Sequence, residues 1–141
     1  SGPRSIELAQ RKADGIMTTT PDPELVHQFP DGPRYIEVAL AYAPTQDAGR
    51  ELARDRFRFS AFDWSVNSEV PTVEGFEAAT RFVRADDLAE VIPAGPDAAG
   101  HLTAIRKAID AGFDHIVLTG IGPDQLAFTR FFAEELRPNL P

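Results

Sequence analysis

Three short apolar runs, separated by segments of helical pattern, restrict the fold of this chain more than any other feature. They lie at residues 15–19 (GIMTT), 35–43 (YIEVALAYA) and 116–119 (IVLT). Helical patterns follow each run, and alternation of strands with helices is typical of a parallel sheet. Nearly continuous apolar character indicates strands that are covered on both faces. We therefore expect an α/β fold with about three buried parallel strands and covering helices.

Residues that commonly begin or end helices support the helices that the spacing of apolar residues indicates. Pro3 suits the first position of a helix over 3–12, and Thr45 can cap a helix that runs to Phe57. Gly112 is suited to the left-handed residue that ends the helix before the third strand. A last helix is expected from Pro123 to Pro138.

The length of the chain favours a single domain. Its 141 residues, 43% of them hydrophobic, can bury one sizeable core, and nothing in the size requires two. We expect one domain over 1–141, with an irregular insertion near 58–84 that contains the only tryptophan, Trp64. Trp64 is open to three interpretations: it covers a pocket, fills a subunit contact, or anchors a hydrophobic cluster.

Three parallel strands are too few to close a barrel or to protect each other. A buried parallel strand needs neighbours at both edges and cover on both faces. The Ser-Gly-Pro turn at 1–3 is also of the kind that normally receives a strand. We expect the chain to be a fragment of a longer protein; the alternative is a short gene product completed by a partner or by a second copy.

Charge and cysteine content exclude several classes of function. The chain has 22 acidic and 14 basic residues, a net charge of -8, and scattered arginines, which disfavours nucleic-acid binding. The absence of cysteine excludes disulfides and thiolate metal sites and fits a cytoplasmic location. No apolar run approaches the roughly 20 residues of a membrane helix, so no membrane partner is expected.

The charged and titratable residues give few candidates for catalysis. His27, His101 and His115 lie in separate elements without metal-ligand spacing, so no metal site is expected. We expect His27 and His101 at the surface, and His115 in a structural role at the start of its strand. Glu37 interrupts an apolar strand, and it either points into an interior site or is paired near the start of that strand.

Several motifs carry a resemblance to a known family. SGPRSIELA with ADG, and AGFDHIVLTGIGPDQ with FFAEEL, are its most specific pieces. They resemble the C-terminal portion of the luciferase-like monooxygenase superfamily, and above all its coenzyme F420-dependent oxidoreductases related to glucose-6-phosphate dehydrogenase. Such proteins are (β/α)8 TIM barrels. The resemblance implies that this chain supplies the helix after the fifth strand, and the sixth to eighth strands with their helices.

The resemblance also implies a site and a chemistry. Ser1 and Gly2 would contact the cofactor, because a helix N-terminus suits a phosphate oxygen. Thr19, at the carboxyl end of a strand, would line the same pocket. The cofactor would exchange a hydride with a small organic substrate while the protein binds and orients both. Because the usual acid-base residues belong to the first half of the barrel, no catalytic residue is assigned, and the chain alone is expected to be inactive.

Two other functions stay open. An FMN-dependent monooxygenase would keep the superfamily but change the cofactor. A non-catalytic half-barrel could instead serve as a binding or assembly module, with its exposed edges covered by oligomerisation.

One stretch departs from the resemblance. Related enzymes that act on sugar phosphates have a lysine shortly after the threonine, where this chain has TPDP at 20–23. Because the Asp22 carboxylate would repel a phosphate, we expect the substrate not to be a sugar phosphate.

Overall fold

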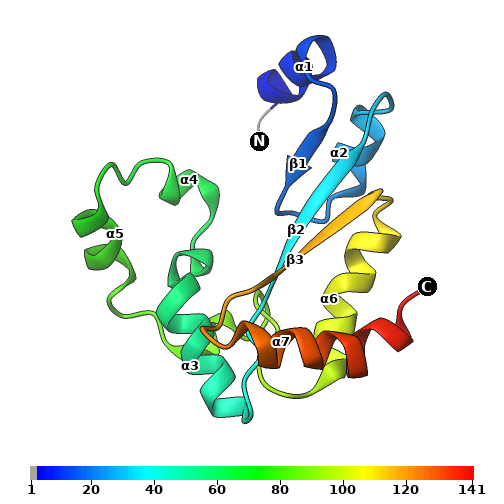
Figure 1. Cartoon of the computed structure of the whole chain (residues 1–141). Coiled ribbons are helices and arrows are strands. Elements are labelled where there is room, and N and C mark those ends of the chain that lie inside the picture. Colours follow the sequence, from blue (N-terminus) through cyan, green and yellow to red (C-terminus); the bar gives the residue numbers. More distant parts are fainter. Residues whose placement is uncertain (1–2) are drawn as a thin grey trace.

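A computed structural model describes residues 3–141, and within them three parallel strands form one sheet in the order β1-β2-β3. The strands are β1 (Ile16–Thr18), β2 (Arg34–Leu40) and β3 (His115–Gly120). The register places Ile16 beside Arg34, and Tyr35 beside His115. Helices connect and cover the strands, as Figure 1 shows. The α/β class with three parallel strands, predicted from the sequence, is therefore confirmed.

The helical elements agree closely with the capping signals. Thr45 caps α3 by accepting a hydrogen bond from the backbone N–H of Ala48, and Gly112 has a left-handed φ of 90° after α6. The elements are α1 (Pro3–Lys12), α2 (Pro23–Gln28), α3 (Gln46–Phe57), η1 (Arg58–Ala61), α4 (Trp64–Asn67), α5 (Val73–Thr80), η2 (Ala85–Leu88), α6 (Ala98–Asp110), α7 (Gln125–Phe131), η3 (Phe132–Leu136) and η4 (Arg137–Asn139).

The end of the chain differs from the predicted single helix. The α-helix α7 stops at Phe131, a π-helical turn follows over η3, and a 3-10 turn over η4. Pro138 lies in that last turn, where its ring is tolerated because the α-helical hydrogen bonding has already ended.

One face of the sheet carries the core, and we call it the covered face. Ile36 and Leu40 of β2 are fully buried, and Ile116 and Leu118 of β3 pack beside them. Helix α6 and the C-terminal helical segment lie against this face, contributing Ile105 and other apolar residues. The alternation of side chains along each strand sends the remaining residues to the opposite face.

The opposite face, which we call the uncovered face, is formed by Met17, Tyr35, Glu37, His115 and Val117. Met17 is 61% exposed and Val117 is 42% exposed. Tyr35 and His115 stack on each other, with ring centroids 4.5 Å apart. Within the described residues this face is uncovered because the helices pack on the other side and at the strand ends, as expected of three parallel strands that are too few to protect each other.

A second cluster closes the carboxyl end of β2. Ala41 packs with Ala53 of α3, Leu88 of η2 and Ile92. The backbone of α3 comes very close to Gly95 at Gly49, where a Cβ atom would overlap the Gly95 backbone. This close contact fixes the position of α3 at the end of the sheet where barrel enzymes place their sites.

His101 is buried, so its predicted surface position is wrong. It is 0% exposed, its Nε2 lies 2.9 Å from the Gly95 carbonyl, and its ring meets Phe131 edge to face. Burial lowers its pKa, which keeps the imidazole neutral in the core. The residue sits on the apolar stripe of α6, where a histidine with one carbonyl partner fits as a core residue.

None of the described helices has both the length and the apolar character needed to cross a lipid bilayer.

Candidate functional site at the carboxyl ends of the strands

A hollow of about 1560 Å³ opens where β1 ends before β2 does. Strand β1 pairs with β2 only as far as Thr18 beside Ile36, whereas β2 continues to Leu40. The next contact on that side is the bridge between Ala41 and Ala94. Residues 37–39 of β2 therefore line the hollow along an edge that β1 leaves free.

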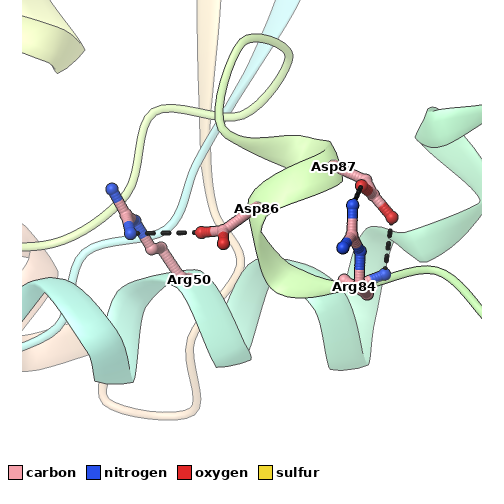
Figure 2. Close-up of polar contacts among 4 residues, drawn as sticks. All are labelled: Arg50, Arg84, Asp86 and Asp87. Atoms are coloured by element: carbon pink, nitrogen blue, oxygen red, sulfur yellow. Dashed lines mark hydrogen bonds and ion pairs between the residues drawn. The ribbon is translucent and has the colours of Figure 1, made fainter.

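Residues 58–84, which we call the α4–α5 arm, form the other side of the hollow. In Figure 1 the arm projects away from the strands and returns to η2 beside α3. Figure 2 shows two ion pairs at its base: Arg50 of α3 with Asp86, at 3.2 Å, and Arg84 with Asp87, at 3.1 Å. The first pair and buried Leu88 join the end of the arm to α3, whereas the second pair caps η2 locally.

The ends of the strands supply the polar part of the hollow. Thr19, the candidate cofactor contact, follows β1 directly, is exposed, and lines the hollow together with Thr20 and Glu37. The Thr119 hydroxyl donates a hydrogen bond of 2.7 Å to the Glu37 carboxylate. Of the two interpretations of Glu37, the fold favours the first, since its side chain lies on the uncovered face and reaches the hollow.

The other two candidate cofactor residues, Ser1 and Gly2, lie outside the described residues. The helix that follows them, α1, begins at Pro3 as the capping signal predicts.

Apolar side chains of the arm form a wall that the sequence did not identify. Trp64 is 70% exposed and Val73 is 73% exposed, and both line the hollow with Phe59 and Phe76. Val91, beyond the arm, joins them. Trp64 stands out in the sequence as the only tryptophan, but for the other four residues the sequence pattern does not separate a pocket wall from a core or interface position.

The charge lining the hollow is predominantly negative. Six carboxylates face three cationic groups, Arg56, Arg58 and Lys107; the six are Glu37, Asp55, Asp63, Glu77, Glu90 and Asp97. The backbone N–H of Ser65 donates to Asp63 at 2.8 Å and holds the pKa of that carboxyl below its usual range. The lining therefore disfavours a doubly charged anion.

A different ion pair joins the amino ends of β2 and β3. Arg34 Nε and Asp114 Oδ2 are 2.8 Å apart, Arg34 Nη2 and Asp114 Oδ1 are also 2.8 Å apart, and the Arg34 backbone N–H donates to the same carboxylate. These hydrogen bonds lower the pKa of Asp114 to about 2. Because the pair joins β2 to the start of β3 at the end remote from the hollow, its role is to hold the register of the sheet.

Within residues 3–141, no three histidine, aspartate or glutamate side chains cluster in a way that would hold a metal ion.

Comparisons with known proteins identify relatives of one kind. No protein-family model matches the chain. An F420-dependent glucose-6-phosphate dehydrogenase of Microbacterium testaceum is 30% identical over 169 aligned positions, which include 99% of this chain and 46% of that protein. The chain thus spans about half the length of the curated relative that it matches.

Two solved structures match nearly the whole chain. An F420-dependent secondary alcohol dehydrogenase, solved with an F420-acetone adduct, superposes with a TM-score of 0.72 at 18% identity over 99% of this chain and 47% of its own. The coenzyme F420-dependent tetrahydromethanopterin reductase of Methanopyrus kandleri gives a TM-score of 0.67 at 16% identity, over 99% of this chain and 49% of its own. At these identities the matches show a shared fold.

All three of these proteins are named for F420, and the alternative cofactor FMN finds no support among them. The resemblance predicted from the sequence is confirmed. This chain is similar to the C-terminal portion of F420-dependent glucose-6-phosphate dehydrogenases, and it shares the fold of about half of two F420-dependent TIM-barrel enzymes.

Proposed function

We propose that this chain forms the C-terminal units of an F420-dependent oxidoreductase barrel, with the uncovered face of its sheet turned toward the barrel interior. The exposure of Met17 and Val117 carries the proposal, because parallel strands with one bare apolar face require further strands and side chains to cover them. Coverage of 46% of the related glucose-6-phosphate dehydrogenase supports the same arrangement. The covering half belongs either to the same polypeptide or to a second subunit.

The described residues fit a planar deazaflavin at the Thr19 end of the hollow. Thr19 and Thr20 offer hydroxyl groups there, and residues 37–39 offer an unpaired stretch of strand edge. The cofactor, when bound, supplies hydride transfer to or from the substrate. Thr19 would hydrogen-bond the cofactor, and Ser1 and Gly2 would contact its phosphate through a helix N-terminus.

The hydrogen-bonded pair of Glu37 and Thr119 would line the interior of the completed barrel. Its carboxylate reaches the same hollow as Thr19, and the hydroxyl of Thr119 fixes its direction. We propose that this pair orients groups that lie near the bound cofactor. Acid-base catalysis is left to residues of the covering half.

Cofactor titration of the completed protein tests this function. The intact mass of the protein in its source cells identifies whether the covering half is in the same chain, and the completed protein is then titrated with F420 and with FMN. We expect tight binding of F420 alone, weakened about tenfold by Thr19→Val, which removes one hydrogen bond while keeping the shape. Thr129→Val, on α7 and outside the hollow, is the matched control.

The titration has two outcomes that would overturn the proposal. Binding of FMN in place of F420 would make the protein a monooxygenase candidate. A stable homodimer of the 141-residue chain that binds neither cofactor would identify an assembly module.

A further inference from the structure

His101 is the only titratable side chain in the fully buried core of the described residues. Its Nε2 atom lies 2.9 Å from the Gly95 carbonyl oxygen. Because a carbonyl can only accept, Nε2 carries the proton of the neutral ring. The other nitrogen, Nδ1, is buried and forms no hydrogen bond with any described residue. A buried polar atom without a partner lowers stability, so packing alone does not account for a histidine at this position.

The residue that His101 holds, Gly95, belongs to the segment 93–95, which borders the hollow. Ala94 lines the hollow and forms the bridge to Ala41, just beyond the end of β2. The Gly95 backbone N–H donates to the Ala41 carbonyl at 3.0 Å, and the φ of Gly95 is a left-handed 86°. The imidazole is thus one of two hydrogen-bonding partners that fix the Gly95 residue beside the hollow.

The surroundings of the imidazole suit its neutral form. Phe131 of α7 meets the ring edge to face, with centroids 5.1 Å apart, and Tyr42, after β2, stacks on Phe131. Asp97 is the carboxylate whose charge acts on the ring, but its side chain caps α6 by accepting from a backbone N–H. The charged side chains of α7 and η3 are exposed: Arg130, Glu134 and Glu135. A proton on Nδ1 would therefore be an unpaired donor in the core.

We propose that His101 is a positioning residue for the hollow: its neutral imidazole holds the Gly95 carbonyl and the segment 93–95, and protonation releases them. The proton on Nδ1 has no acceptor in the closed core, so the protonated ring gains stability when the segment opens and admits water. The bearing on the cofactor rests on the proposed function, since the segment borders the hollow assigned to F420. The release itself involves only the described residues.

The direction of the pH dependence follows from burial. Burial lowers the pKa of His101 in the folded chain, whereas the unfolded histidine has a pKa of about 6.5. Since the open state binds the proton more readily, the closed state is fully favoured above about pH 6.5 and loses stability as the pH falls below it. The contribution of Asp114 changes only below about pH 5, so the interval between these values reports on His101.

Hydrogen exchange of the 141-residue chain, resolved by NMR, tests the release. We compare protection factors, which are corrected for the intrinsic exchange rate, at about pH 7.5 and about pH 5.5. We expect the protection of the Gly95 amide to fall about tenfold between the two conditions. The amide of Ile105, in the middle of α6, should stay better protected than Gly95 at both, because only the segment opens.

Two variants separate the hydrogen bond from the titration. His101→Gln supplies an N–H donor that does not titrate, so Gly95 should keep its protection at both pH values. His101→Leu has no donor, so protection should be about tenfold lower already at the higher pH. His27→Gln is the matched control, since His27 is an exposed histidine of α2 and its loss should leave the wild-type profile unchanged.

Three results would overturn the inference: unchanged protection of Gly95 between the two pH values, equal protection of Gly95 and Ile105 falling together as in global unfolding, or loss of the pH profile in His27→Gln. The amide spectrum establishes that each variant is folded, and the wild-type profile decides the matter if a His101 variant does not fold. None of these measurements involves F420, so their failure leaves the cofactor titration intact, and failure of that titration leaves the release readable.

Discussion

Two glycines in helices show how differently the same residue is used at the residue scale. Gly49 in α3 faces the Gly95 backbone with no space for a Cβ atom, whereas the nearest atom to a Cβ on Gly100 in α6 is Pro93 Cβ, at 3.9 Å. The first glycine is required by contact between backbones. The second has no steric reason to be glycine and makes the helix less stable than alanine would.

We expect Gly49→Ala to destabilise the chain by about 1–3 kcal/mol, because α3 must move away from the end of the sheet. Gly100→Ala should stabilise it by about 0.5–1 kcal/mol. Urea unfolding of both variants measures the difference. Equal effects of the two substitutions would show that α3 does not pack closely on Gly95.

The ion pair between Arg34 and Asp114 predicts a dependence of stability on pH. The pKa of Asp114 is lowered to about 2 in the folded chain, from about 3.9 when unfolded. Since the unfolded state binds the proton more readily, the contribution is complete above about pH 5 and is lost as the pH falls toward about 2. Stability measured from pH 6 to pH 2 should therefore fall more steeply for wild type than for Asp114→Asn.

Arg34→Leu should flatten the same dependence of stability on pH. The double variant Arg34→Leu/Asp114→Asn should differ little from either single variant, because both residues take part in one interaction. Additive effects of the two substitutions would contradict the assignment.

At the scale of the element, the capping signals located helices and the apolar runs located the three strands of the described sheet, but the runs do not tell which face of a strand is covered in this chain. Thr45 and Gly112 act through their immediate neighbours in sequence, so their effect is readable without the fold. Met17 and Val117 have the sequence pattern of buried residues, yet they are exposed here because burial depends on what lies across the sheet. His101 was predicted at the surface but is buried, since its burial depends on its contacts with Gly95 and Phe131.

The candidate site was predictable only in part, for the same reason. Thr19 could be placed at a strand end from the local pattern alone. The wall made by Trp64 and Val73 could not, because it forms only when the arm returns to α3 and brings distant segments around one hollow.

The ion pair at the base of the arm gives a prediction at this scale. Arg50→Ala removes the contact with Asp86, and because the pair is exposed the global stability should change by less than about 1 kcal/mol. The amides of residues 58–84 should nevertheless exchange with solvent several times faster, because local opening becomes easier. Hydrogen exchange followed by mass spectrometry measures this.

Arg54→Ala is the matched control, since within residues 3–141 the ion pairs of Arg54 are with Glu51 and Asp55 of its own helix. Faster exchange in both variants alike would show that the Arg50 contact has no special role.

At the scale of the whole molecule, the two faces of the sheet have separate roles. The covered face, with Ile36 and Leu40, holds the chain together, whereas the proposed function assigns the uncovered face to the interior of a completed barrel. A charge on the uncovered face should therefore leave the chain folded but prevent completion. We expect Val117→Lys to keep the unfolding midpoint of the isolated chain within a few degrees while abolishing F420 binding by the completed protein.

Val66→Lys is the control, since Val66 has a similar exposure of 45% but lies on the arm and outside the hollow. Unchanged cofactor binding in Val117→Lys would show that this face is not part of the barrel interior.

The order of strands has a practical consequence for the chain in isolation. Because β3 is a terminal strand of the described sheet and six residues long, one side of it presents backbone groups to any strand that approaches. Copies of the chain at high concentration can meet along this side and grow into ordered aggregates. A proline or lysine introduced in β3 will therefore raise the solubility limit of the chain more than better packing of the core will.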